Sequence, residues 1–295
     1  MAETRFACGA RVNVAIRRLA LGLLASLCVT GSTAPLHACS AKTACTVEGR
    51  DYFIALPEDT TRPLPAVVYI HGWGGSGAGA LRNSGMVNGY LNRGFAVIAP
   101  DGRLRQSGGG RSWAFHPRSE LQADDIAFLQ NVRDDATERF DLDPERILLA
   151  GFSISGSMTA YTACLAPDSF AAYAPIGGNF WRPHPTTCTG PVRMLHTHGW
   201  SDGTVPLEGR VVNRLPADDP DAFAQGDIFY ALNLWRDTNG CRHLKADRFD
   251  MTGPFWRRAW DRCVEGSALE FALFPGGHAI PAEWPDLVVD WFEGL

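Results

Sequence analysis

Short apolar runs alternate along the chain with stretches in which apolar residues recur at helical spacing. Three runs rich in apolar residues, at 66–70 (AVVYI), 95–99 (FAVIA) and 147–150 (ILLA), each lead into a turn that contains Gly or Pro. Residues 124–140 instead carry apolar side chains near every third or fourth position. This alternation predicts a fold of the α/β class, in which helices cover a mostly parallel sheet.

The second half of the chain continues the same pattern. Further strands are predicted at 193–196 (RMLH), before a turn with Gly and Asp, and at 269–274 (LEFALF), before a Gly-rich turn, and residues 285–292 have the spacing of a closing amphipathic helix. Parallel strands end at a common edge of the sheet, which is where such folds bind ligands. We therefore expect the reactive side chains in the turns that follow these runs.

Residues 1–38 have the pattern of a Sec-type signal peptide. Arginines precede an apolar run at 19–30, and small residues follow it up to Ala38. The run is shorter than the roughly 20 residues that cross a bilayer as a helix, although a buried N-terminal helix is an alternative. We expect an exported protein, secreted or periplasmic, in which residues 39–295 form one domain.

Residues 36–39 (LHAC) offer a second interpretation of the same region. They resemble the cleavage box of a lipoprotein, in which Cys39 would carry the lipid. His37 fits that box poorly, and an even number of cysteines supports ordinary secretion instead. Lipid anchoring at Cys39 is therefore kept only as an alternative.

The charge balance of residues 39–295 argues against a polyanionic partner. The signal-like segment holds four of the 27 basic and one of the 32 acidic residues, so the remainder carries a net charge of −8. A nucleic-acid or anionic-membrane surface requires the opposite sign. We expect no nucleic acid and no membrane among the partners.

Six of the eight cysteines remain when the two before residue 38 are set aside. An even number in an exported chain indicates disulfides. Proximity in the sequence suggests the pairs Cys39–Cys45, Cys164–Cys188 and Cys241–Cys263, although six cysteines allow 15 connectivities. A zinc site is the alternative, but the six contain no C-x-x-C pair, so we expect no metal.

Residues 151–156 (GFSISG) have the features of a nucleophile elbow. They lie between the apolar run at 147–150 and a stretch of small residues, which is the strand-turn-helix context that the motif requires. Small neighbours allow a tight turn to lift the hydroxyl of Ser153 off the sheet. Ser155 stands where G-x-S-x-G has its second Gly, so the match is incomplete and a purely structural turn is the alternative.

A serine hydroxyl needs a base to take its proton, and the base needs an orienting group. His278 lies in the Gly-rich turn after 269–274, and Asp202 lies in the turn after 193–196. The order Ser153, Asp202, His278 is that of α/β hydrolases and differs from that of chymotrypsin-like and subtilisin-like proteases. We predict that these three residues form a catalytic triad. Structural roles are expected of three other histidines: His71, His196 and His198.

Residues 71–77 (HGWGGSG) follow the run at 66–70 and suit an oxyanion hole. In that arrangement the backbone N–H groups of Trp73 and Ile154 would bind the negative charge of a tetrahedral intermediate. Gly-rich loops also bind phosphates, but this one lacks the G-K-[ST] ending of a P-loop and the G-x-G-x-x-G spacing. We therefore expect neither a nucleotide nor another cofactor.

Five segments together resemble the polyhydroxybutyrate depolymerase and feruloyl esterase group of secreted esterases. They are HGWGGSG, DPERILLAGFSISGSM, HGWSDGTVP, the NGC and WDRC pair, and PGGHAIPAEW. The resemblance covers roughly residues 39–295 and implies an α/β-hydrolase fold with helices on both faces of the sheet. It also implies the triad Ser153, Asp202 and His278, in agreement with the residues themselves.

The resemblance leaves the substrate open. The chain continues for only 17 residues after His278, without a linker or a polymer-binding domain, so we expect weak attack on solid polyester. Trp113 and Trp200 are candidates for lining an acyl or aromatic pocket. Tryptophans more often pack in cores, and that is the alternative for both.

The leading hypothesis is hydrolysis of carboxylic esters through an acyl-enzyme, with hydroxyalkanoate oligomers as substrates. A feruloyl or acetylxylan esterase that acts on plant polysaccharide is the alternative. A hypothesis of another class is a catalytically silent binding protein that keeps the fold. A peptidase on the same fold is a further possibility, because fold alone does not decide the reaction.

Overall fold

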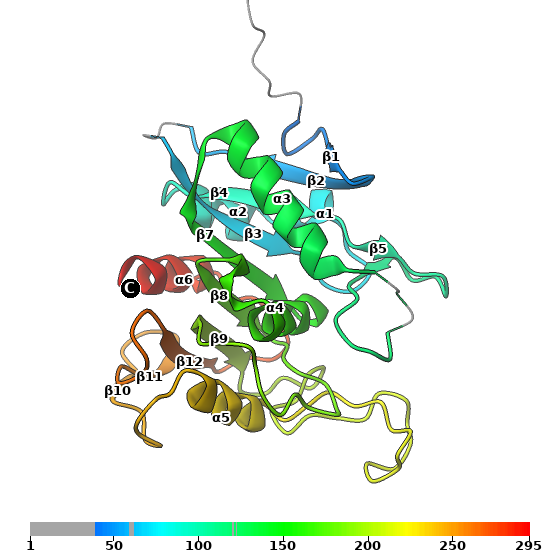
Figure 1. Ribbon diagram of the computed structural model, residues 1–295, viewed down its shortest axis with the longest axis vertical. Helices are drawn as coiled ribbons and strands as arrows, with labels where there is room; N and C mark the ends of the chain where they lie inside the picture. Colours follow the sequence, from blue (N-terminus) through cyan, green and yellow to red (C-terminus); the bar gives the residue numbers. More distant parts are fainter. Residues whose placement is uncertain (1–38, 59–61, 120, 122) are drawn as a thin grey trace, which may run out of the picture. The chain divides into compact units, whose positions relative to one another are not determined.

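The computed structural model describes residues 39–295, except residues 59–61, 120 and 122 (Figure 1). The predicted signal peptide at 1–38 lies outside the described residues, and it stays a prediction.

A ten-stranded mixed sheet forms the centre of this region. Its strands are β1 (Cys45–Val47), β2 (Arg50–Ala55), β3 (Leu64–Ile70), β4 (Ala96–Pro100), β7 (Leu142–Phe152), β8 (Ala172–Ile176), β9 (Arg193–Gly199), β10 (Arg248–Asp250), β11 (Trp256–Trp260) and β12 (Ala268–Phe274). They are ordered β1-β2-β4-β3-β7-β8-β9-β12-β11-β10. The central strands from β4 to β12 are parallel, and the two strands at each edge pair antiparallel. A small ribbon of β5 (Arg103–Leu104) and β6 (Arg111–Ser112) lies apart from this sheet.

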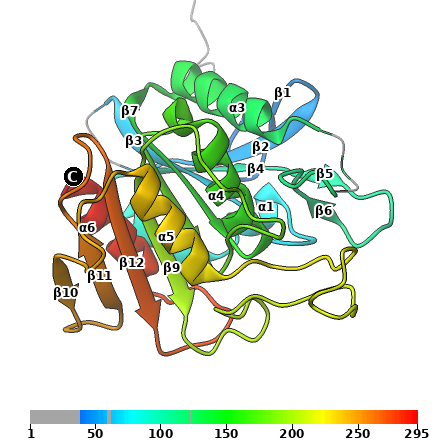
Figure 2. The same cartoon turned by 60° about the horizontal axis from the view of Figure 1, so that its bottom comes forward.

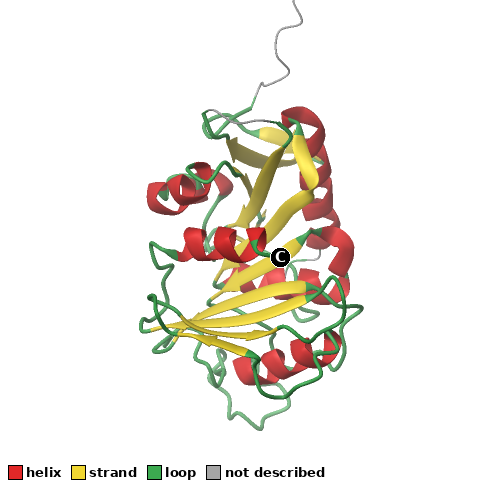
Figure 3. Cartoon of the chain, turned by 90° about the vertical axis from the view of Figure 1, so that its left-hand side faces the viewer, coloured by secondary structure: helices red, strands yellow, loops and turns green. Residues whose placement is uncertain are grey.

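Helices cover both faces of the sheet (Figures 2 and 3). They are α1 (Gly77–Ala80), α2 (Ser84–Leu91), α3 (Asp125–Phe140), α4 (Ile154–Leu165), α5 (Ile228–Thr238) and α6 (Trp284–Glu293), with a 3₁₀ turn at Pro167–Ser169. The buried side chains of α3, α4 and α5 belong to the core on one face, and those of α2 and α6 belong to the core on the other. The predicted α/β architecture, with helices on both faces, is confirmed.

The side chains of the buried strands alternate between these two cores. In β7, Ile147 and Leu149 contribute to the core under α3, α4 and α5, whereas Leu148 and Ala150 contribute to the core under α2 and α6. Because both faces of its second half are covered, the sequence at 147–150 is continuously apolar instead of alternating. The buried end of this strand leads directly into the turn at Ser153.

Three disulfides join the cysteine pairs that the sequence suggests: Cys39–Cys45, Cys164–Cys188 and Cys241–Cys263. The second of them ties the last turn of α4 to the loop that precedes β9. Within the described ranges, no helix is long and apolar enough to cross a membrane. The same residues contain no cluster of three or more His, Cys, Asp or Glu side chains that could hold a metal ion.

Candidate active site

Ser153 occupies the sharp turn between β7 and α4. Its backbone has φ 65° and ψ −123°, a conformation that side-chain-bearing residues rarely adopt. The Ser153 N–H donates to the carbonyl oxygen of Ile176, at 2.9 Å, which fixes the turn to β8. A Cβ atom at Gly151 would lie 2.5 Å from the carbonyl oxygen of Ser155, so only glycine fits there. The predicted elbow geometry is present.

Ser155, the departure from the usual motif, is fully buried in this turn. Its Oγ lies 2.8 Å from the carbonyl oxygen of Ile70, at the end of β3, and 2.7 Å from that of Phe152. The hydroxyl therefore serves as a donor to the backbone. A reactive role for Ser155 would require an exposure that the structure does not give it.

The structure brings together the three residues of the predicted triad. His278 follows β12, and its Nε2 lies 2.8 Å from the Oγ of Ser153. Its Nδ1 lies 2.7 Å from Oδ2 of Asp202, in the turn after β9. The Phe152 ring packs against the imidazole, with 4.5 Å between ring centroids. The side chains therefore come from the carboxyl ends of three parallel strands.

These contacts determine how the imidazole is protonated. A carboxylate only accepts hydrogen bonds, so Nδ1 of His278 carries the hydrogen that it donates to Asp202. In the neutral ring, Nε2 is then the acceptor for the Ser153 hydroxyl. This is the tautomer that a general base needs in order to take the proton of a serine nucleophile.

Asp202 is nearly buried, and its carboxylate is held on both oxygens. Oδ1 accepts from the N–H groups of Thr204 and Val205, at 2.9 and 2.8 Å, while Oδ2 accepts from His278. Burial by itself raises the pKa of this carboxyl, but the hydrogen bonds from His278 and Val205 outweigh it and leave the pKa below its ordinary value. Asp202 is therefore ionised near neutral pH.

The predicted oxyanion loop runs from β3 to α1 and lies against the elbow. A Cβ atom at Gly72 would be 3.9 Å from Cβ of Ser153. The loop is held by bonds from Gly74 N–H to the Arg111 carbonyl and from Gly75 N–H to the Gly72 carbonyl. Ile154 is the first residue of α4, where backbone N–H groups have no partner within the helix. The role of the Trp73 and Ile154 amides in binding an oxyanion stays a prediction.

His71 has a structural place in the same loop. Its Nε2 accepts from the N–H of Gly102 at 2.9 Å, so its Nδ1 donates to the Gly72 carbonyl at 2.8 Å. The ring is buried, and burial lowers its pKa below the ordinary value for histidine. His71 therefore stays neutral and connects the oxyanion loop to the turn after β4.

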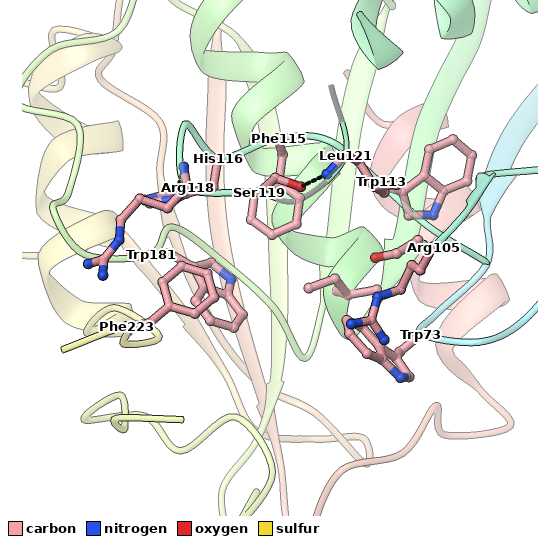
Figure 4. Close-up of a pocket in the computed structure, with 12 residues that line it drawn as sticks. Trp73, Arg105, Trp113, Phe115, His116, Arg118, Ser119, Leu121, Trp181 and Phe223 are labelled. Carbon is pink, nitrogen blue, oxygen red and sulfur yellow. Dashed lines mark hydrogen bonds between the residues drawn. The ribbon is translucent and has the colours of Figure 1, made fainter. Parts of the chain in front are cut away.

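A cavity of about 230 Å³ adjoins the elbow on the side of the oxyanion loop (Figure 4). Both predicted oxyanion residues, Trp73 and Ile154, lie in its wall. Five of its ten other lining residues carry aromatic rings and two are arginines: Arg105, Ser112, Trp113, Phe115, His116, Arg118, Ser119, Leu121, Trp181 and Phe223. The aromatic rings are packed on one another, for example Trp181 on Phe223 with 4.6 Å between centroids. The cavity can therefore accept a flat apolar group.

The two tryptophans that the sequence suggested for a pocket have different positions. Trp113 lies in the cavity wall, but it is only 1% exposed and its Nε1 donates to the His71 carbonyl. Trp200 is not among the residues that line this cavity. It is 58% exposed and packs edge-on against Trp256, with 6.3 Å between centroids. Only Trp113 thus belongs to the cavity, and its role there is mainly structural.

Sequence reasoning missed most of the cavity lining. Phe115, His116 and Arg118 come from the loop between β6 and α3, while Phe223 comes from the long connection before α5. Such loops have no hydrophobic period, so the sequence carries no signal that brings them together. Trp181 follows β8 and belongs to the buried core, and it also lines the cavity.

The chain is similar in sequence to one family model and to proteins that are named as esterases. The model of the prolyl oligopeptidase family matches residues 84–180, which include the elbow. A protein of Nocardia uniformis subsp. tsuyamanensis that is named as an esterase, NocK, is 32% identical over 171 residues, or 56% of this chain and 46% of its own length. Feruloyl esterase B of Piromyces equi is 32% identical over 203 residues, or 65% of this chain and 36% of its own. The chain thus spans less than half the length of these two relatives.

The solved structures support the fold. Acetyl xylan esterase from Aspergillus awamori superposes with a TM-score of 0.62 and 17% identity, covering 83% of this chain and 94% of that one. Together with the parallel sheet and the strand-turn-helix elbow, this likeness establishes the α/β-hydrolase fold.

Proposed function

We propose that this protein is a serine carboxylic-ester hydrolase that acts through an acyl-enzyme. The observation that carries the proposal is the chain of contacts from Ser153 Oγ to His278 Nε2, at 2.8 Å, and from His278 Nδ1 to Asp202, at 2.7 Å. A strained elbow, an oriented imidazole and a buried carboxylate are the parts that activate a serine hydroxyl. The names of the relatives as esterases support the same reaction class.

The reaction follows from these contacts. Ser153 Oγ attacks the ester carbonyl while His278 takes its proton, and the imidazolium that forms is stabilised by Asp202. The tetrahedral oxyanion receives hydrogen bonds from the Trp73 and Ile154 amides, each of which contributes about 3 kcal/mol in comparable sites. His278 then donates its proton to the leaving alcohol. Water, activated by the same imidazole, attacks the acyl-enzyme and releases the acid and Ser153.

An aromatic acyl group, such as feruloyl, suits the cavity better than an acetyl or hydroxybutyryl group does. The wall of the cavity joins the oxyanion residues Trp73 and Ile154, so a carbonyl bound there directs one of its substituents into the cavity. Rings of Phe115, Trp181 and Phe223 offer faces and edges to another ring. An acetyl group would leave most of the 230 Å³ unfilled.

The alcohol part of the substrate would then lie on the side of the His278 turn. Trp200 and Ser201 donate backbone hydrogen bonds to Phe274 and Gly276, so the turns that carry Asp202 and His278 are joined beside the exposed Trp200 ring. We propose that the Trp200 ring contacts the alcohol part of the ester substrate. A feruloyl ester of a plant polysaccharide is the substrate that this division of the site favours.

We also infer that the protein is exported, with residues 1–38 as its signal peptide. Three disulfides in the described residues support an oxidising compartment. Detection of the mature chain outside the cytoplasm, beginning near residue 39, would test this inference. A full-length chain that stays in the cytoplasm would contradict it.

A peptidase is the second candidate, because the prolyl oligopeptidase family model matches the region of the elbow. The chemistry of the two classes differs only in the leaving group, an amine in place of an alcohol. A comparison of ferulic-acid methyl ester with the matching ferulic-acid amide separates them. Turnover of the amide at a rate similar to that of the ester would favour the peptidase.

The test of the proposed function is release of acid from a panel of soluble esters by the purified protein. The panel contains methyl ferulate, a feruloylated arabino-oligosaccharide, acetylated xylo-oligosaccharide, 3-hydroxybutyrate dimer and trimer, and p-nitrophenyl acetate. We expect the highest kcat/KM on the ferulates. Preference for the hydroxybutyrate oligomers would instead support a polyhydroxybutyrate depolymerase, and no turnover of any member would support a catalytically silent binding protein.

A further inference from the structure

Two buried histidines lie behind the carboxylate of Asp202, on one face of β9. His196 and His198 are 2% and 0% exposed, and residues two apart in a strand point to the same side. Their rings are stacked with 5.5 Å between centroids and 5° between planes. The hydrogen bonds of the two rings go to each other and to Val205, and not to Ser153 or His278. The sequence predicts a structural role for both histidines, and their hydrogen bonds show what that role is.

The hydrogen bonds define the tautomer of each ring. His198 Nε2 lies 2.8 Å from the carbonyl oxygen of Val205, which can only accept, so this nitrogen carries the hydrogen. Nδ1 of the neutral ring is then an acceptor, and it receives the hydrogen of His196 Nε2 at 3.2 Å. His196 Nδ1 has no partner among the described residues, which agrees with a neutral acceptor nitrogen. Burial lowers the pKa of both rings and keeps them neutral.

The pair is connected to the active site through the turn that holds Asp202. Val205 accepts from His198 with its carbonyl oxygen and donates its N–H to Oδ1 of Asp202, at 2.8 Å. His198 Nε2 also lies 3.6 Å from Oδ2 of Asp202, the oxygen that accepts from His278. The imidazole N–H of His198 therefore faces the carbonyl oxygen of Val205, the residue that holds Oδ1 of Asp202, and lies near Oδ2 itself.

We infer that His198 is a positioning residue for Asp202, and that His196 holds His198 in the tautomer this role needs. Without the N–H at Nε2, the Val205 carbonyl loses its partner and the 202–205 turn can shift. A shift of Asp202 misorients His278 toward Ser153. The inference rests on the proposed esterase function, because it concerns the geometry of that reaction.

The tautomer itself can be measured in the unmodified protein. Long-range ¹H–¹⁵N correlation spectra of ¹⁵N-histidine-labelled protein at pH 7 report which ring nitrogen carries hydrogen. We expect both His196 and His198 as neutral rings with the hydrogen on Nε2. A His198 ring that is charged, or that carries its hydrogen on Nδ1, overturns the inference without any variant having to fold.

Two variants test the consequence for catalysis. His198→Phe keeps the ring and removes the N–H, whereas His198→Gln retains a donor near the position of Nε2. We expect kcat on methyl ferulate to fall by up to about 100-fold in His198→Phe with KM within about two-fold, as for misplacement of a catalytic group, and to recover substantially in His198→Gln. The low-field proton resonance of the His278–Asp202 hydrogen bond should weaken in His198→Phe and return in His198→Gln.

The outcomes separate this inference from the proposed function. A wild-type protein without esterase activity contradicts the proposed function, whatever the tautomers are. An active wild type, together with a folded His198→Phe variant of unchanged kcat and an unchanged low-field resonance, overturns only the positioning role. Equal losses of activity in His198→Phe and His198→Gln would also contradict it, because the donor would then have no part in the effect.

Discussion

The hydroxyl of Ser155 lies 2.8 Å from the carbonyl oxygen of Ile70, and this contact joins the nucleophile elbow to the strand that leads into the oxyanion loop. Most elbows of this type have glycine at the position of Ser155. Here the serine hydroxyl connects the end of β7, which directly precedes Ser153, with the end of β3, which leads into the loop that carries Trp73. The substitution thus adds a link between the two parts of the site that must stay in register.

The first prediction concerns this link. In Ser155→Ala the Ile70 carbonyl loses a buried donor, which typically costs about 1–3 kcal/mol of the free energy of unfolding. We expect urea denaturation to show a loss of this size, with esterase activity reduced but present. Complete loss of activity in a folded Ser155→Ala variant would contradict the structural role that we assign to this serine.

The second prediction tests the cavity as the acyl site. Phe223→Ala removes one ring from the aromatic wall, so KM for methyl ferulate should rise about ten-fold, as expected for an apolar contact of about 1.4 kcal/mol. Activity on p-nitrophenyl acetate should change little, because an acetyl group does not reach that ring. Steady-state kinetics on the two esters provide the measurement.

Phe249→Ala is the matched control for this experiment. Phe249 is a half-exposed aromatic on the edge strand β10 and is not among the cavity residues. Its removal should leave both esters unaffected. If Phe223→Ala and Phe249→Ala behave alike on methyl ferulate, the acyl group binds elsewhere.

The third prediction is a pH dependence of stability that arises from Asp202. Burial raises the pKa of this carboxyl, but its hydrogen bonds with His278 and Val205 lower it overall. A depressed carboxyl pKa contributes stability above the unfolded-state pKa, and this contribution is lost as the pH falls through the folded-state pKa. We therefore compare the free energy of unfolding of the wild type with that of Asp202→Asn. The wild type should lose stability relative to the variant as the pH falls below about 5. Urea denaturation of both proteins at a series of pH values measures this difference, and a difference that grows on acidification would reverse the sign we assign.

The fourth prediction concerns the disulfides. Cys164–Cys188 closes a loop of 24 residues and Cys39–Cys45 a loop of 6. In the chain-entropy model the longer loop gives about 1 kcal/mol more stabilisation. The double variant Cys164→Ala/Cys188→Ala should thus be less stable than Cys39→Ala/Cys45→Ala in chemical denaturation. The opposite order would show that local strain or denatured-state structure, and not loop closure, decides the effect.

Much of the fold could be predicted because its signals are local. The run at 147–150 is apolar on both faces of β7, and the capping carboxylate of Asp124 precedes α3, where it accepts from the Ala127 N–H. Strand β8 was not predicted as a separate element. Its sequence (AYAPI) contains a proline and two alanines, and it becomes a strand through its pairing with β7 and β9.

The candidate site also has a part with local sequence signals, the triad, and a part without them, the cavity. Ser153, Asp202 and His278 each lie in a glycine-containing turn that follows a predicted strand, so their positions could be predicted from the sequence. The cavity could not, because its lining comes from loops whose proximity depends on the whole tertiary structure. Trp200, expected in a pocket, is an exposed ring outside that cavity, since an isolated tryptophan in a turn carries no sign of what surrounds it.

The most direct test of the central claim is covalent labelling with a fluorophosphonate, followed by mass spectrometry of peptides from the wild type, Ser153→Ala and Ser155→Ala. A serine activated by His278 attacks the phosphorus and becomes stably phosphonylated. The account predicts label on Ser153 in the wild type and in Ser155→Ala, and none in Ser153→Ala, which should melt at nearly the wild-type temperature. Label on Ser155, or a wild-type protein that is not labelled, would contradict it.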